Sequence, residues 1–292
     1  MSDLDERTGE TPAAFLNRME AAARRWDTPC GDGVMEWRSW DQTGGTGPLL
    51  VLLHGGAGSW RHWVRNIAEL SRSYRLVVPD LPGLGGSADP PNGEDVDAVT
   101  AILAAGLDAV IGDATPYDVV GFSFGSTLAV CLAALHGNRV RSVTILGSSA
   151  VGPAGSRVDL VKVRHLAGEA RVEAHRVNLS RLMIAEPGKI DDLALAIQEW
   201  NTQHSRLKTP ALSRSGALMR ALDQVHVPVH GIWGEFDAPA NPRARERVAV
   251  LRQVRPEAKL HLIPGAGHWV AYEAPETVNN LLLGLLAAKA RP

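Results

Sequence analysis

The sequence predicts an α/β protein built around a mostly parallel sheet, and two observations carry this prediction. From Pro48 onward, short runs of apolar, β-forming residues alternate with stretches of helical periodicity, as expected when parallel strands are buried on both faces and connected by helices. The chain also has 292 residues, of which 45% are hydrophobic, and such a chain can bury one large core.

Six buried strands are expected after Pro48, at residues 49–53, 76–79, 118–122, 143–146, 229–233 and 259–263. Helical periodicity predicts helices at residues 60–72, 94–111, 124–136, 243–252 and 275–289. Ahead of this region, residues 13–26 are typical of a short amphipathic helix. Turn residues from Thr28 then lead to a strand with the sequence MEWRSW at 35–40.

The alternation stops between about Gly152 and Leu212, where charged helical stretches replace buried strands. This segment has about 60 residues and greatly exceeds a usual connection. We therefore expect a core formed by residues 1–150 and 213–292, and a helical lid formed by residues 151–212 at the mouth of a site near the strand ends. Ordinary crossover helices without a role in substrate binding are the alternative.

Composition and charge argue against nucleic acids and membranes as partners. The formal net charge is −2, the pI is near 6.6, and no block of like charges occurs. The first residues lack the basic and apolar segments of a secretion signal. The longest apolar runs are also shorter than the ~20 residues that cross a bilayer. These features predict a cytoplasmic protein that acts on a small molecule.

The two cysteines, Cys30 and Cys131, have neither metal-ligand nor redox spacing. We expect no metal site, and no disulfide between them, because cytosolic proteins rarely keep one.

The motif that points to chemistry is Gly121-Phe122-Ser123-Phe124-Gly125, a G-x-S-x-G placed between a predicted strand and a predicted helix. In a nucleophile elbow the chain turns so sharply that small residues must flank the serine, whose hydroxyl is left exposed at the strand end. A tight turn without chemistry is the alternative. The strand before the motif and the helix after it favour Ser123 as a nucleophile.

A serine nucleophile needs a base and an acid that orients the base. His268 follows the last predicted strand on a glycine-rich loop, and Asp237 lies just beyond the strand at 229–233. The chain order Ser, Asp, His is the one found with such elbows. Glu235 could replace Asp237 if the loop is wound differently. Other histidines have structural interpretations: His54 in a backbone turn, and His62, His165, His175 and His204 on helix surfaces or in the insertion.

An oxyanion formed during attack on a carbonyl requires hydrogen-bond donors. The run His54-Gly55-Gly56-Ala57-Gly58 follows a predicted strand, and its glycines allow backbone N–H groups to approach a substrate. We expect the N–H groups of Gly56 and Phe124 to form the oxyanion hole. A phosphate-binding loop is the alternative, but the run lacks the required Lys-Ser/Thr ending. A second glycine-rich loop, residues 80–87, is expected to pack near the site, supported by Asp80 and Ser87.

These motifs resemble the α/β-hydrolase superfamily in their order along the chain: HGG at 54–56, DLPGLGGS at 80–87, GFSFG at 121–125, the GEFD segment that ends at Asp237 and GAGH ending at His268. The resemblance covers residues 37–285. It implies an eight-stranded, mostly parallel sheet, a helical lid after the sixth strand and no cofactor. Ser123 excludes the members of the superfamily that use an aspartate nucleophile.

The pair His268-Trp269 and the following EAPE resemble the carbon–carbon bond hydrolases that cleave ring-fission products, which implies that Trp269 contacts substrate. That branch carries Asn and Ser where this chain has Phe122 and Gly56, and its lid arginine aligns approximately with Gln198. Arg206 or Arg181 could serve in place of that arginine.

Because of these departures, we favour hydrolysis of a carboxylic ester, lactone or thioester over carbon–carbon cleavage. Cofactor-free oxygenases, perhydrolases and non-catalytic ligand-binding proteins with this fold remain further alternatives. The apolar C-terminal helix could join two copies in a homodimer, or pack against its own sheet.

Overall fold

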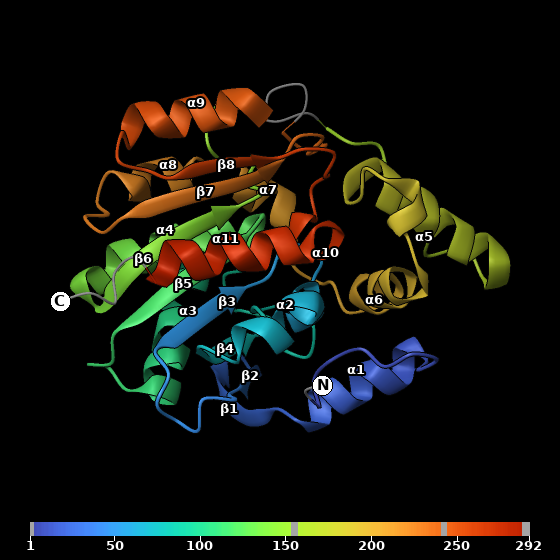
Figure 1. Cartoon of the computed structure of the whole chain (residues 1–292), viewed down its shortest axis with the longest axis horizontal. Helices are drawn as coiled ribbons and strands as arrows, with labels where there is room; N and C mark the ends of the chain where they lie inside the picture. The colour runs from blue at the N-terminus through green and yellow to red at the C-terminus, as the bar shows by residue number, and fades with distance from the viewer. Residues whose placement is uncertain (1–2, 153–156, 241–243, 288–292) are drawn as a thin grey trace.

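The computed structural model describes residues 3–152, 157–240 and 244–287. These residues form an eight-stranded sheet with helices on both faces (Figure 1). The strands are β1 (Arg24–Cys30), β2 (Gly33–Trp40), β3 (Leu49–Leu53), β4 (Arg75–Pro79), β5 (Tyr117–Phe122), β6 (Val140–Leu146), β7 (Val229–Gly234) and β8 (Leu260–Ile263). Their spatial order is β1-β2-β4-β3-β5-β6-β7-β8. The pairs β1–β2 and β2–β4 are antiparallel and the others parallel, which confirms the predicted fold class.

Two hydrophobic cores cover the two faces of the sheet. Side chains of a strand point alternately to opposite faces, so Leu50 and Leu52 of β3 enter one core while Leu49, Val51 and Leu53 enter the other. The first core contains residues of α1 (Pro12–Ala21), η1 (Trp60–Trp63), α2 (Val64–Leu70), α10 (Val270–Glu273) and α11 (Pro275–Ala287). The second contains residues of α3 (Val96–Ile111), α4 (Phe124–His136), α8 (Ala217–Leu222) and α9 (Ala244–Val254).

The predicted strands after Pro48 are all present, and the largest difference is at β6, which begins at Val140 instead of residue 143. The helix predicted at 124–136 is found with the same bounds. The predicted helix limits at 243 and 289 lie outside the described residues. The short η2 (Gly137–Arg139) connects α4 to β6.

The prediction for residues 13–26 was wrong in its second half. Helix α1 ends at Ala21, and residues 24–30 form β1, which pairs with β2 from Arg24 opposite Ser39 to Cys30 opposite Gly33. Gly31, with φ of +55°, begins the two-residue turn between them. Pairing with β2 therefore overrides the local helical pattern.

In the segment between β6 and β7, the described residues before Gly168 form no helix or strand, and helices follow from there. The segment contains α5 (Gly168–Leu182), η3 (Pro187–Lys189), α6 (Asp192–Gln203), α7 (Thr209–Ser213) and α8. Figure 1 shows α5 and α6, which we call the inserted pair, beyond one edge of the layered core. Glu199 of α6 joins the pair by bonds to Arg171 (2.8 Å) and His175 (2.6 Å) of α5. Helices α7 and α8 instead pack on α4, so the predicted boundary at 212 falls within α7.

No helix in the described part of the chain has the length and hydropathy needed to span a membrane. Helix α11 buries Val278, Leu282, Leu285 and Leu286 in the first core. The apolar C-terminal helix therefore packs against its own sheet.

Candidate active site

Ser123 lies at a sharp turn between β5 and α4. Its backbone has φ of +52° and ψ of −115°, a strained conformation for a residue other than glycine. The flanking glycines are required by backbone contacts: a β-carbon on Gly121 would overlap the carbonyl oxygen of Gly125, and one on Gly125 would overlap the carbonyl oxygen of Leu53. The turn therefore has the geometry of a nucleophile elbow.

The structure brings Ser123, His268 and Asp237 together at the carboxyl ends of the strands. His268 follows β8 and Asp237 follows β7, and in a parallel sheet these strand ends share one edge. Nε2 of His268 lies 3.0 Å from Oγ of Ser123, and Nδ1 lies 3.0 Å from Oδ1 of Asp237. Asp237 is fully buried and His268 is 4% exposed. The imidazole thus bridges a hydroxyl and a water-excluded carboxylate.

The alternative acid, Glu235, does not take part in this chain of hydrogen bonds. Its carboxylate lies 3.3 Å from the guanidinium of Arg245 and accepts a hydrogen bond from the N–H of Gly265 at 3.3 Å. The backbone N–H of Ala240 also donates to Oδ1 of Asp237, at 3.2 Å, which fixes the oxygen that faces the imidazole.

The peptide between Gly55 and Gly56, in the loop after β3, has its orientation fixed by a local hydrogen bond. Nε2 of His54 accepts from the N–H of Leu81 at 2.9 Å, so Nδ1 carries the proton and donates to the carbonyl oxygen of Gly55 at 2.8 Å. In a planar trans peptide the N–H points opposite to the C=O, so the Gly56 N–H faces away from His54. Within the described residues, neither this N–H nor that of Phe124 has a hydrogen-bond acceptor.

The loop of residues 80–87 is held as expected by Asp80 and Ser87. The carboxylate of Asp80 accepts hydrogen bonds from the backbone N–H groups of Trp60 (2.8 Å) and Gly86 (3.0 Å). The hydroxyl of Ser87 donates to the carbonyl oxygen of Asp80 and accepts from the N–H of Glu36 at 2.9 Å. Both side chains therefore brace backbone and leave no group for chemistry.

His62 is a site residue that sequence reasoning missed, since we expected it on a helix surface or in the insertion. It is 2% exposed, its Nδ1 accepts from the N–H of Gly55 at 3.3 Å, and its ring lies 5.4 Å from that of Phe122. Burial and the neighbouring His54 and His268 lower the pKa of His62 well below its ordinary value. Every residue of η1 is buried, including the polar Arg61 and His62, so the polarity of His62 indicated an exposure that the structure does not have.

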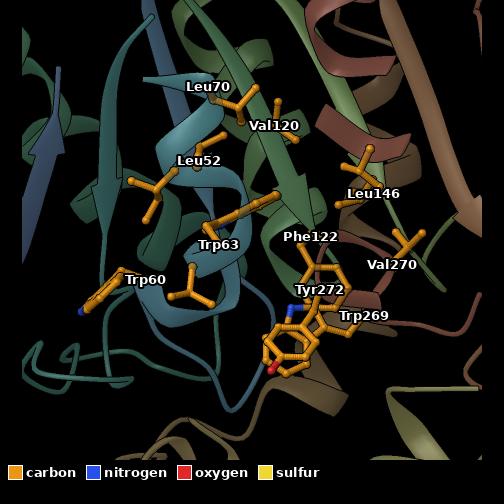
Figure 2. Packing of buried hydrophobic residues seen from close by; sticks show 14 of the residues in the cluster. Leu52, Trp60, Trp63, Leu70, Val120, Phe122, Leu146, Trp269, Val270 and Tyr272 are labelled. Carbon is orange, nitrogen blue, oxygen red and sulfur yellow. The ribbon is translucent and has the colours of Figure 1, made fainter. Parts of the chain in front are cut away.

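Trp269, expected to contact substrate, is fully buried. Its indole N–H donates to the carbonyl oxygen of His62 at 2.9 Å, and its ring stacks on Tyr272 with centroids 4.2 Å apart. Figure 2 shows it against Tyr272, near Phe122. In this structure Trp269 packs against His62 and Tyr272, and its contact with substrate stays a prediction.

The positions considered for a carboxylate-binding arginine are engaged elsewhere. Arg206 pairs with Asp89 at 2.6 Å, and Arg181, which is exposed, donates to a carbonyl oxygen at 3.2 Å. Gln198 donates to Thr202 within α6. Cys30 and Cys131 are buried free thiols. Among the described residues, no group of three potential ligands is arranged to hold a metal ion.

The profile of the alpha/beta hydrolase family matches residues 50–281 of this chain. The chain is 29% identical over 265 residues to the dihydrolipoyllysine-residue acetyltransferase component of the acetoin cleaving system of Pseudomonas putida; the match covers 85% of this chain and 66% of that protein, just under two thirds of its length.

Two further relatives match over most of both chains. The 2-hydroxy-6-oxo-6-phenylhexa-2,4-dienoate hydrolase of Burkholderia cepacia is 26% identical over 287 residues, which cover 92% of this chain and 98% of that one. The pimeloyl-(acyl-carrier protein) methyl ester esterase of Nitrosomonas europaea is 29% identical over 250 residues, which cover 80% and 94%.

Proposed function

Because this chain belongs to the alpha/beta hydrolase family, we propose that it is a serine hydrolase that cleaves a small carboxylic ester, lactone or thioester through an acyl-enzyme on Ser123. One observation carries the proposal: the His268 imidazole lies 3.0 Å from both the Ser123 hydroxyl and the buried Asp237 carboxylate. This arrangement gives a serine hydroxyl its base and gives the base its orienting acid.

In the proposed reaction, Oγ of Ser123 attacks the acyl carbon while Nε2 of His268 accepts its proton. Asp237 stays ionised and holds the proton on Nδ1 of His268, which fixes the tautomer that can act as base. The carbonyl oxygen becomes an oxyanion that accepts hydrogen bonds from the N–H groups of Gly56 and Phe124. His268 then protonates the leaving alkoxide, and the same imidazole activates the water that hydrolyses the acyl-enzyme.

The two N–H groups are suited to the oxyanion for different reasons. The bond from His54 to Gly55 orients the N–H of Gly56 before substrate arrives, so no reorganisation is needed during the reaction. The N–H of Phe124 is the first of α4, where the helix dipole favours negative charge.

The ester reaction is preferred to carbon–carbon cleavage because of what surrounds Ser123. Gly56 offers no side chain, Phe122 is apolar, and Arg206 and Arg181 are engaged away from the site, so the cation expected for a substrate carboxylate is missing from these positions. The name of the methyl ester esterase relative supports the ester reaction. The inserted pair would then act as a cap that selects a small-molecule substrate in the cytoplasm.

The test is labelling by a fluorophosphonate, followed by intact-protein mass spectrometry and turnover of a p-nitrophenyl ester series. The wild type should gain one phosphonyl group and hydrolyse short esters. Ser123→Ala should do neither while keeping the wild-type melting temperature, and Ser180→Ala, which removes an exposed serine of α5, should behave as wild type. If neither Ser123→Ala nor the wild type is labelled, Ser123 is not a nucleophile and ligand binding without catalysis becomes the better account.

Carbon–carbon cleavage is the second candidate function, favoured by the match over nearly the full length of the dienoate hydrolase. It is tested by adding a ring-fission diketone to the same preparations. Turnover of the diketone without turnover of any ester in the series would replace the ester assignment, while labelling of Ser123 would stand.

A further inference from the structure

The hydroxyl of Thr209 lies against the loop that carries Gly56. Thr209 begins α7 and follows residues 204–208, an irregular segment that returns from the inserted pair and makes one isolated bridge, between Ser205 and Leu84. This segment is fixed to the loop of residues 80–87, because the N–H groups of Arg206 and Leu207 both donate to the carbonyl oxygen of Gly83, at 3.0 and 3.1 Å. The residues just before Thr209 are therefore held in place by backbone hydrogen bonds, next to the loop that carries Gly56.

Gly56 has no side chain because Thr209 occupies that space. A β-carbon built on Gly56 would overlap Oγ1 of Thr209 and would lie 2.9 Å from its β-carbon. The hydroxyl is thus the group of Thr209 nearest to Gly56, at the point where a side chain of residue 56 would begin. That point is one bond from Cα of Gly56, and the backbone N–H of Gly56 is an expected oxyanion donor.

The hydroxyl of Thr209 is also without a protein partner. The residue is 6% exposed, and its Oγ1 is not one of the fully buried polar atoms that lack a partner, so this oxygen is open to solvent. None of the described residues accepts from or donates to its Oγ1. A threonine kept for packing alone could be valine, which has the same shape without the hydroxyl.

We infer that the Thr209 hydroxyl is a third donor of the oxyanion hole, next to the N–H groups of Gly56 and Phe124. This inference rests on the proposed serine hydrolase reaction. The hydroxyl rotates freely, so it can direct its hydrogen to the oxygen that the Gly56 N–H contacts, and it keeps its proton throughout. The donor comes from the segment that follows the inserted pair, so the hole is complete only when this segment is seated on the core.

The test compares Thr209→Val, which removes only the hydroxyl, with Thr209→Ser, which keeps it. Turnover of p-nitrophenyl esters is divided by the fraction of Ser123 that a fluorophosphonate labels. Loss of one oxyanion donor costs on the order of 100-fold or more in kcat; for a third donor we expect Thr209→Val to lose about 10- to 100-fold in kcat with KM changed less than about 2-fold. Thr209→Ser should stay within about 3-fold of wild type.

Two controls separate donation from packing. Thr209→Ala lacks the hydroxyl and should share the loss of kcat, and Thr46→Val, at an exposed position between β2 and β3, should retain wild-type kcat. A trifluoromethyl ketone, whose adduct with Ser123 carries an oxyanion, should lose affinity for Thr209→Val by the same factor as kcat/KM.

Equal kcat in Thr209→Val and wild type would overturn the inference, as would an equal loss in Thr209→Ser. A wild type that neither labels nor hydrolyses esters would instead refute the proposed function, and the third donor with it.

Discussion

The backbone N–H of Gly267 donates to the carboxylate of Glu273 at 2.7 Å, immediately before His268. The same carboxylate accepts from the N–H groups of Ala185 (3.1 Å) and Glu186 (2.8 Å), in the segment after α5. Glu273 is only 3% exposed. One buried side chain therefore ties the loop of the proposed catalytic base to the inserted pair.

Removing this carboxylate should weaken both the fold and the site. Glu273→Ala leaves three buried N–H groups without their acceptor, so we expect the free energy of unfolding to fall by about 2–4 kcal/mol. The His268 loop should also lose its position, with a lower kcat. Urea unfolding and ester turnover measure the two effects. Glu276→Ala, at an exposed position of α11, is the control; a similar small change in both variants would contradict the assigned role.

If Asp237 and not Glu235 orients His268, substitutions of the two carboxylates should have opposite effects on activity. Asp237→Asn should reduce kcat by about 10³–10⁴-fold, because the amide no longer favours the imidazole tautomer in which Nε2 accepts a proton. Glu235→Gln should retain most of the activity, since Glu235 contacts Arg245 and Gly265 and not the imidazole. Steady-state kinetics on the two variants suffices. A larger loss in Glu235→Gln would mean that the loop is wound differently in the active enzyme.

The sequence predicted the serine, the histidine and the aspartate because each follows a recognisable buried strand. In a parallel sheet the strand ends share one edge, so residues that follow strands meet there whatever their separation along the chain. Ser123 and Asp237 illustrate this, since they lie far apart along the chain but follow two strands of the same sheet, β5 and β7. Gly121 and Gly125 were a further local signal, because the sharp turn at Ser123 leaves no space for a side chain at either position.

The rest depended on contacts that no local pattern encodes. β1 exists because β2 offers it a partner, although residues 13–26 look helical. His62 and Glu273 are buried polar residues whose side chains accept hydrogen bonds from backbone N–H groups, from Gly55 for His62 and from the distant Ala185 for Glu273. The expectation that Trp269 contacts substrate came from the resemblance alone, and no local pattern indicated that it packs against Tyr272 and His62. Thr209 lies in a segment without any motif.

Stability should fall as the pH decreases below about 6.5, the ordinary pKa of histidine. Burial lowers the pKa of His54 and, more strongly, that of His62, so below pH 6.5 the unfolded chain binds protons that the folded chain does not. The free energy of unfolding then decreases by up to about 1.4 kcal/mol per pH unit for each such histidine. The loss begins at the unfolded pKa and is complete below the folded one.

Urea unfolding at pH 7.5, 6.0 and 5.0 measures this slope, and His62→Asn isolates one contribution. The asparagine oxygen can accept from the Gly55 N–H as Nδ1 of His62 does, but it does not titrate. The variant should therefore be less stable than wild type at pH 7.5 and show a shallower decrease toward pH 5.0. An unchanged slope would mean that His62 takes up its proton over the same pH range in the folded and the unfolded protein.

The elbow itself predicts a contrast between two glycines. Gly121→Ala places a methyl group on the carbonyl oxygen of Gly125, and since both belong to backbone that holds Ser123, neither can move without opening the turn. We expect a loss of at least about 3 kcal/mol or failure to fold. Gly284→Ala, in α11 with open space at the new methyl, should instead stabilise the protein by about 0.5–1 kcal/mol. Urea unfolding of both variants decides the matter, and a Gly121→Ala protein as stable as wild type would show that the turn is looser than this contact allows.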